Sequence, residues 1–223
     1  MKNRIISVIA AATLAILPSV TQAQLVGTGT GANNFPFGGS GTVYQQVYAS
    51  SNFPSGGNLQ SVSFFLDPEA GAGSFLRTGT YSLFVSTTSV AVNALSTSNF
   101  DSNRGANNIL FGTYVIGANT ASPNVLTFAA QNAFNYVPGA GNLLLDFRIS
   151  GGGASTSAFY KADNGDAGGA FSRSHDFGSQ FADWGLQTQF NYGPTTTTPE
   201  PSTIVLMGAG FLAVFAARRR RTN

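Results

Sequence analysis

The sequence predicts an all-β protein with a single β-sandwich domain of the jelly-roll type. Short runs in which apolar residues recur at every second position are separated by turn-forming segments, and no long helical pattern interrupts them. The chain has 223 residues, of which 27 are glycine and only 9% are charged. This composition is typical of short strands joined by many turns.

Eight segments have the two-residue alternation of strands. They are residues 42–48, 59–66, 80–86, 110–116, 124–128, 143–150, 157–160 and 186–192. The clearest has Leu143, Leu145, Phe147 and Ile149 on one face and Asp146, Arg148 and Ser150 on the other. We expect its polar face to lie on the outside.

The segments between these strands carry turn signals. Proline, glycine and asparagine gather at residues 54–58, 68–73, 103–108, 138–142, 151–153 and 164–165. Only residues 88–100 could form a helical turn, and their Ser and β-branched residues disfavour it. The Gly-rich residues 24–40 are either a loose leader or an edge of the domain.

The N-terminus has the features of a secretory signal peptide. Lys2 and Arg4 precede the apolar residues 5–17. The segment that ends at Ala23 has the small-residue pattern of a signal-peptide cleavage site. We therefore expect residues 1–23 to be removed by cleavage between Ala23 and Gln24, and residues 24–194 to form the exported domain. An uncleaved anchor is the alternative, although the apolar run is shorter than the ~20 residues of a typical span.

The C-terminus predicts a short membrane span. A Thr linker at residues 195–198 leads to Pro199, Glu200 and Pro201, a motif that interrupts a helix. Residues 202–217 are uncharged and mostly apolar, and as a helix they rise ~24 Å, slightly less than the ~30 Å hydrocarbon core. The basic anchor after this span is Arg218, Arg219, Arg220 and Arg221. Because positive flanks stay in the cytoplasm, we expect the domain on the periplasmic side of the inner membrane.

Residues 199–221 resemble the PEP-CTERM sorting signal of Gram-negative bacteria, which has a Pro-Glu-Pro motif, a short span and a basic cluster in this order. The resemblance implies that an exosortase-type enzyme processes the tail, and that the protein then reaches the cell surface or the extracellular matrix. A permanent tail anchor is the alternative. Residues 79–83, 141–146 and 185–190 also look like a recurrent ectodomain of PEP-CTERM proteins, a group with no assigned activity.

Charge and cysteine content exclude several classes of function. Between residues 24 and 198 there are five basic and eight acidic side chains, so the net charge is −3 and no basic stripe is available for nucleic acid. The absence of cysteine excludes disulfides, thiol nucleophiles and Cys-ligated metals. We expect no cofactor.

The one histidine offers little catalytic chemistry. His175 beside Asp176 could act as a general base toward Ser172 or Ser174. No Gly-x-Ser-x-Gly motif is present, however, and a solvated loop histidine is the favoured interpretation.

The acidic residues suggest two further kinds of site. A glycosidase needs two carboxylates roughly 5 to 10 Å apart, and no such pair can be assigned among the acids. The candidates are Asp67, Glu69, Asp146, Asp163, Asp166, Asp176 and Asp183. Asp163 and Asp166 flank a glycine turn and could hold calcium, but an Asx turn is favoured.

Aromatic side chains suggest a surface for sugars. Tyr160, Phe177 and Trp184 could stack on sugar rings, although most aromatic residues of a β-sandwich belong to its core, and we expect residues 171–184 to be an exposed loop. The sequence therefore predicts an exported surface or matrix protein without enzymatic activity, which could act by binding glycan. Its association with exopolysaccharide or biofilm matrix is implied by the resemblance to PEP-CTERM proteins. A secreted carbohydrate-active hydrolase and a passive structural surface protein are the alternatives.

Overall fold

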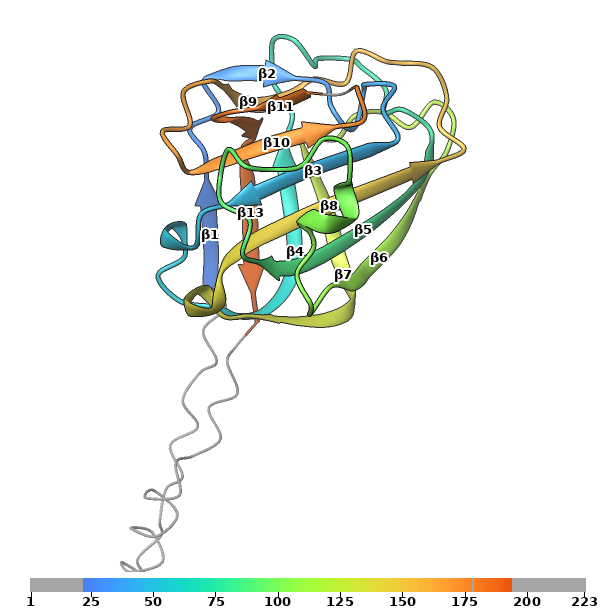
Figure 1. Cartoon of the computed structure of the whole chain (residues 1–223). Helices are drawn as coiled ribbons and strands as arrows, with labels where there is room; N and C mark the ends of the chain where they lie inside the picture. Colours follow the sequence, from blue (N-terminus) through green and yellow to red (C-terminus); the bar gives the residue numbers. More distant parts are fainter. Residues whose placement is uncertain (1–21, 178, 194–223) are drawn as a thin grey trace, which may run out of the picture.

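The computed structural model describes residues 22–177 and 179–193, and it confirms an all-β fold of packed sheets (Figure 1). One sheet has the strand order β1-β13-β4-β7 and the other has the order β11-β10-β3-β8-β5-β6. A third sheet, β12-β9-β2, lies at one end of the molecule. The strands are β1 Gln22–Val26, β2 Gly31–Asn33, β3 Val43–Tyr48, β4 Gly57–Phe65, β5 Gly79–Thr88, β6 Ile109–Ile116, β7 Val125–Tyr136, β8 Asn142–Ser150, β9 Tyr160–Asn164, β10 Phe171–His175, β11 Ser179–Phe181, β12 Trp184–Leu186 and β13 Thr188–Tyr192.

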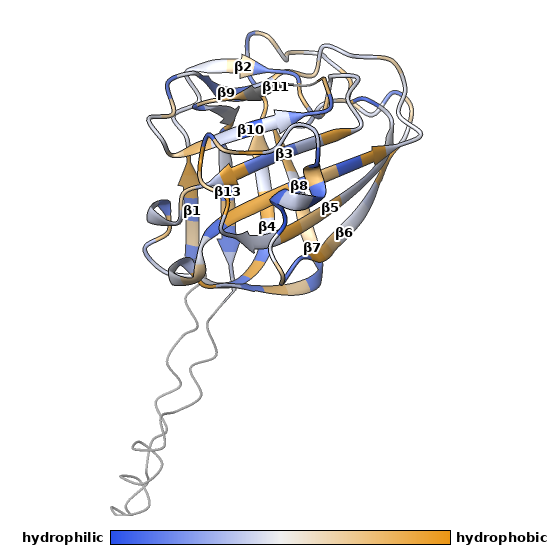
Figure 2. Ribbon diagram, in the orientation of Figure 1, coloured by the Kyte–Doolittle hydropathy of each residue, from blue (hydrophilic) through white to orange (hydrophobic). Residues whose placement is uncertain are grey.

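Aromatic side chains fill the space between the two larger sheets. Phe37, which precedes β3, is fully buried, and its ring centroid lies 5.0 Å from that of Phe64 and 5.4 Å from that of Phe128. Phe147 of β8 meets the same ring edge-on at 5.6 Å. In Figure 2 the strands that line this core are largely orange, with blue bands at their polar positions. Because the chain has no cysteine, this packing stabilises the domain without disulfides.

The two ends of the described chain lie side by side. Strands β1 and β13 are antiparallel, and Gln22 pairs with Tyr192. Figure 1 shows both ends leaving the molecule on the side opposite to β2, β9 and β11. We call the end where the chain enters and leaves the base; it is formed by residues 49–58 and 135–142 with Gln22 and Gly193. The opposite end, with β2, β9 and β11, is the far end.

A long connection covers the outer face of the six-stranded sheet. Residues 89–108, which we call the strap, join β5 to β6 and contain only one short 3₁₀ helix, η2 Phe100–Asn103. The strap residue Leu95 packs on Val47 and Leu144 to form a small second core. The helical turn considered for residues 88–100 is therefore absent, and extended strap takes its place.

The strap changes the surroundings of β8. Leu143, Leu145 and Phe147 face the main core, as their alternation predicts. The expectation that the opposite face is exposed holds for Ser150 and is wrong for Asp146, whose side chain is only 1% exposed. Sequence alternation separates the two faces of a strand, but it does not reveal a distant loop that covers one of them.

Strand assignments from sequence fail mainly after residue 156. The strand expected at 157–160 is β9 Tyr160–Asn164, and the run at 186–192 is divided between β12 and β13, which belong to different sheets. Residues 171–175, expected in a loop, form β10, in which every residue is buried. The segment after Ala23 contributes β1 and β2, so it is an edge of the domain and not a loose leader.

A buried carboxylate joins the N-terminal segment to β9. Asp163 is 1% exposed and accepts hydrogen bonds from the backbone N–H groups of Thr28 and Gly29 and from the Thr28 hydroxyl. Asp166 accepts from the Thr30 hydroxyl at 2.6 Å. These contacts hold residues 28–30 against the chain reversal after β9.

We predict that Asp163→Ala lowers the free energy of unfolding by about 3 kcal/mol, because three donors lose a charged acceptor in a buried site. Urea denaturation followed by Trp184 fluorescence measures the change. Asp166→Ala is the matched control and should shift the midpoint far less, since that carboxylate is exposed. Equal effects of the two substitutions would contradict this account.

Candidate functional site

Five ring side chains form a continuous group near the far end, which we call the aromatic cluster: Phe35, His175, Phe177, Phe181 and Trp184. His175 stacks on Phe35 with ring centroids 4.8 Å apart and an interplanar angle of 9°. On its other side it stacks on Phe181 at 5.2 Å. Phe181 in turn contacts Trp184 at 5.6 Å. The cluster unites the loop before β3 with β10, β11 and β12.

Phe177 is the exposed member of this cluster. Its side chain is 55% exposed, and its ring meets Phe35 at 5.6 Å and His175 at 5.5 Å, both edge-on. Phe177 therefore exposes part of its ring to solvent, while the rings of Phe35 and His175 pack against it. Phe35 is the cluster residue that the sequence interpretation missed, because it lies in a Gly-rich segment with no strand pattern.

The other two predicted sugar-binding residues do not share this exposure. Tyr160 is fully buried and packs on Phe37 at 5.3 Å, so it belongs to the main core. Trp184 is half-buried. The expectation that residues 171–184 form an exposed loop is wrong for β10 and correct for Phe177.

A buried cation lies next to two of the cluster rings. Arg173 is 3% exposed, and its Cζ atom lies 5.0 Å from the Phe181 ring centroid and 5.5 Å from that of Trp184. Among the described residues, its Nε and Nη1 atoms have no hydrogen-bond partner. Burial lowers the pKa of the guanidinium, and the neighbouring Tyr44 hydroxyl opposes that effect. Cation–π contacts thus replace an acidic partner and connect β10 to β11 and β12.

His175 is not the solvated loop histidine that we favoured. It ends β10 and is only 5% exposed. Burial, assisted by the positive charge of Arg173, lowers its pKa below the usual 6.5, and Asp176 opposes the shift. The ring is therefore neutral at pH 7. Since alternate residues of a strand point to opposite faces, Ser172 and Ser174 point away from it, and the geometry gives no serine–histidine pair.

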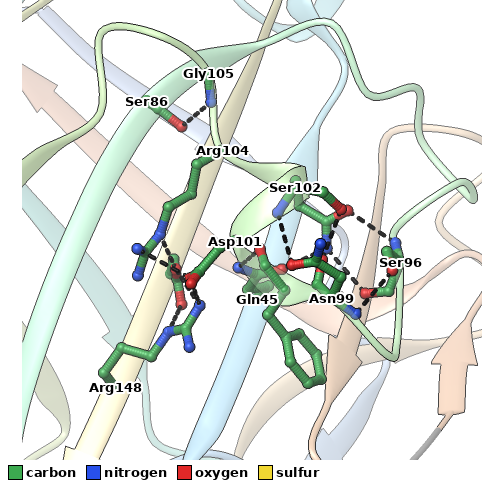
Figure 3. A network of polar contacts seen from close by, with 12 residues as sticks. Gln45, Ser86, Ser96, Asn99, Asp101, Ser102, Arg104, Gly105 and Arg148 are labelled. Carbon is green, nitrogen blue, oxygen red and sulfur yellow. Dashed lines mark hydrogen bonds and ion pairs between the residues drawn. The ribbon is translucent and has the colours of Figure 1, made fainter.

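Asp146 holds the strap on the six-stranded sheet. It accepts hydrogen bonds from Arg104 Nε at 2.6 Å and from Arg148 Nε at 2.8 Å. The same two arginines bind Asp101 on η2, at 3.0 Å and 2.9 Å (Figure 3). Asp101, which was not among the predicted carboxylates, thus lies near Asp146. Guanidinium groups bridge the two acids, so they form a structural ion-pair network.

The remaining acids mostly stabilise loops. Asp67 accepts from the N–H groups of Glu69 and Ala70, and Asp176 accepts from the N–H group and hydroxyl of Thr42. Among the described residues, no three Asp, Glu or His side chains gather as they would around a metal ion. The oxygens of Asp163 and Asp166 accept the hydrogen bonds given above, and calcium binding there stays an untested alternative to the favoured Asx turn.

The predicted targeting sites fall at the limits of the described chain. Ala23 and Gln24 both lie in β1, opposite Asn191 and Phe190 of β13. Cleavage between them would leave residues 24–26 of this strand in the mature protein. The rest of the signal peptide, the Pro-Glu-Pro motif and the arginine cluster lie outside the described residues. Within the described part, no helix is long and apolar enough to cross a membrane.

We predict that Asp146→Ala destabilises the domain by about 3 kcal/mol, because two arginines lose the buried carboxylate that they share. Denaturation in urea measures this loss. The control is Asp101→Ala, which removes a carboxylate that is 70% exposed and should cost at most about 1 kcal/mol. A stable Asp146→Ala variant would show that the strap does not depend on this network.

The lowered pKa of His175 predicts a pH dependence of stability. The unfolded state binds a proton near pH 6.5 whereas the folded state does so only at lower pH, so stability falls as the pH decreases below about 6.5. We expect a smaller decrease in thermal midpoint between pH 7.5 and 5.5 for His175→Phe, which keeps the ring stack but cannot titrate. Identical decreases for both proteins would contradict the assignment.

Comparison with known proteins identifies the C-terminal segment. Residues 197–221 match the family model described as the PEP-CTERM protein-sorting motif. No curated protein and no solved structure matches the chain. The match includes Pro199, Glu200, Pro201 and the four arginines, and the motif implies export and processing by an exosortase. The chain therefore carries a PEP-CTERM sorting motif at its C-terminus, which supports export, joined to an all-β domain.

Proposed function

We propose that this protein binds a glycan of the exopolysaccharide or biofilm matrix through the aromatic cluster, and that it acts without enzymatic turnover. The observation that carries the proposal is the exposure of Phe177, whose ring is 55% accessible and is braced by Phe35 and His175. A flat apolar ring held rigidly at a surface suits stacking on a sugar ring, because little side-chain entropy is lost on binding.

The location of the cluster supports this function. The described chain ends at the base, on the side of the sorting motif, whereas β10 ends near the far end (Figure 1), two residues before Phe177. While the tail is in the inner membrane, the far end points into the periplasm. After processing, the same end is free to contact polymer at the cell surface.

The electrostatics of the cluster suit an uncharged sugar ring. His175 is neutral at pH 7, and the Arg173 guanidinium lies among ring side chains and is shielded from water. The exposed Asp176 next to Phe177 adds a hydrogen-bond acceptor within reach of sugar hydroxyls. The cluster thus combines one stacking surface with one polar acceptor.

We predict that Phe177→Ala weakens binding to the host exopolysaccharide roughly tenfold, because loss of a stacked ring costs about 1.4 kcal/mol. Affinity electrophoresis and glycan arrays measure the effect. Phe75→Ala is the matched control: Phe75 is 49% exposed but is not part of the cluster, and its removal should leave binding unchanged. Hydrolysis of the glycan would favour the hydrolase, and neither binding nor hydrolysis would favour the passive structural protein.

A further inference from the structure

The base of the domain has a surface chemistry unlike the rest of the molecule. Residues 49–58 and 135–142 include no Asp, Glu, Lys or Arg, although the described chain carries charged groups on its other surfaces. The exposed side chains here include Pro54 and Val137, the latter 52% exposed. A shallow pocket of about 280 Å³ opens among them, lined by Gly56, Tyr136 and their neighbours.

Several contacts make the base a rigid surface. Phe53 packs edge-on against Tyr136 at 5.1 Å, which joins the loop after β3 to the end of β7. The Ser50 N–H group donates to the Asn142 side chain at 2.9 Å. The Gly193 N–H group donates to the Asn58 carbonyl at 2.8 Å, so the last described residue lies next to the pocket.

The length of chain beyond Gly193 limits how far the base can lie from a membrane. Eight residues, 194–201, lie between Gly193 and Ser202, where the predicted span begins. Even fully extended, the nine residue-to-residue steps from Gly193 to Ser202 reach only about 30 Å, whereas a domain of this size is about 40 Å across. A tether this short gives the base a high effective concentration at the bilayer surface, so weak attraction is enough to hold it there.

Charge favours the same orientation. The domain between residues 24 and 198 has a net charge of −3, and bacterial anionic lipids repel acidic side chains. Neutral Ser, Asn, Gly and Pro residues lose less hydration energy near headgroups than charged residues do. The base is thus the face that approaches an anionic bilayer at the lowest cost, and it is also the face that the tether brings there.

We propose that, before the tail is processed, the base of the domain rests on the bilayer surface through the loops at residues 53–57 and 135–140. This orientation presents the far end, with the aromatic cluster, away from the membrane. It also keeps the Pro-Glu-Pro motif within a few residues of the membrane face. The proposal depends on the predicted C-terminal span and is independent of glycan binding.

The test uses the full chain inserted in vesicles of phosphatidylethanolamine and phosphatidylglycerol in a ratio of about 3:1. Because the chain has no cysteine, a single introduced cysteine can be labelled with a polarity-sensitive fluorophore. Gly139→Cys places the label at the base, where no atom lies within 4 Å of an added Cβ. Ala70→Cys places it on the exposed loop between β4 and β5 as the matched control.

We expect brominated lipids to quench the label at position 139 at least several-fold more than the label at position 70. Adding Val137→Asp should reduce quenching at position 139, because it brings a negative charge to the anionic surface. Equal quenching at the two positions would overturn the proposal. The proposal would also be overturned if the label at position 139 changed its fluorescence only when the processing enzyme was added, because the base would then contact the enzyme and not the bilayer.

Discussion

The antiparallel pairing of β1 with β13 is the constraint on which the functional geometry depends. It places the first and last described residues side by side, since Gln22 pairs with Tyr192. The two termini of the described chain, one on the side of the predicted signal peptide and one on the side of the sorting motif, therefore lie at one end of the domain. This arrangement gives the domain a direction, with an uncharged base at the end where both termini lie and the aromatic cluster near the other end.

The few charges of the protein are used mainly to hold loops in place. Asp146 and its two arginines hold the strap against β8, and Asp163 holds the N-terminal segment against β9. Arg173 has no acidic partner among the described residues and instead contacts two aromatic rings. An exported domain without disulfides thus combines an aromatic core with a small number of buried polar contacts that connect segments distant in sequence.

Strand alternation predicted most of the sandwich but not the segments that depend on distant partners. Residues 42–48, 110–116 and 143–150 could be assigned because an apolar face alternates with a polar one, and their strands match within one residue at each end. β10 could not be assigned, because its polar outer face is buried by the strap, in which the Asn93 N–H group donates to the Ser172 hydroxyl. His175 and Tyr160 were misplaced for the same reason: their burial comes from Phe35 and Phe37, more than a hundred residues away in sequence.

The sequence alone determined the C-terminal sorting motif of this protein and its fold class. Sorting motifs act as linear segments whose charge and hydropathy can be recognised without a folded partner, and the alternation of a strand is likewise local. The tertiary structure decided which aromatic side chain is accessible, which acids are engaged, and at which end of the domain both termini lie. These properties depend on long-range strand pairing and on loops that cover distant strands, and neither leaves a periodic pattern in the sequence.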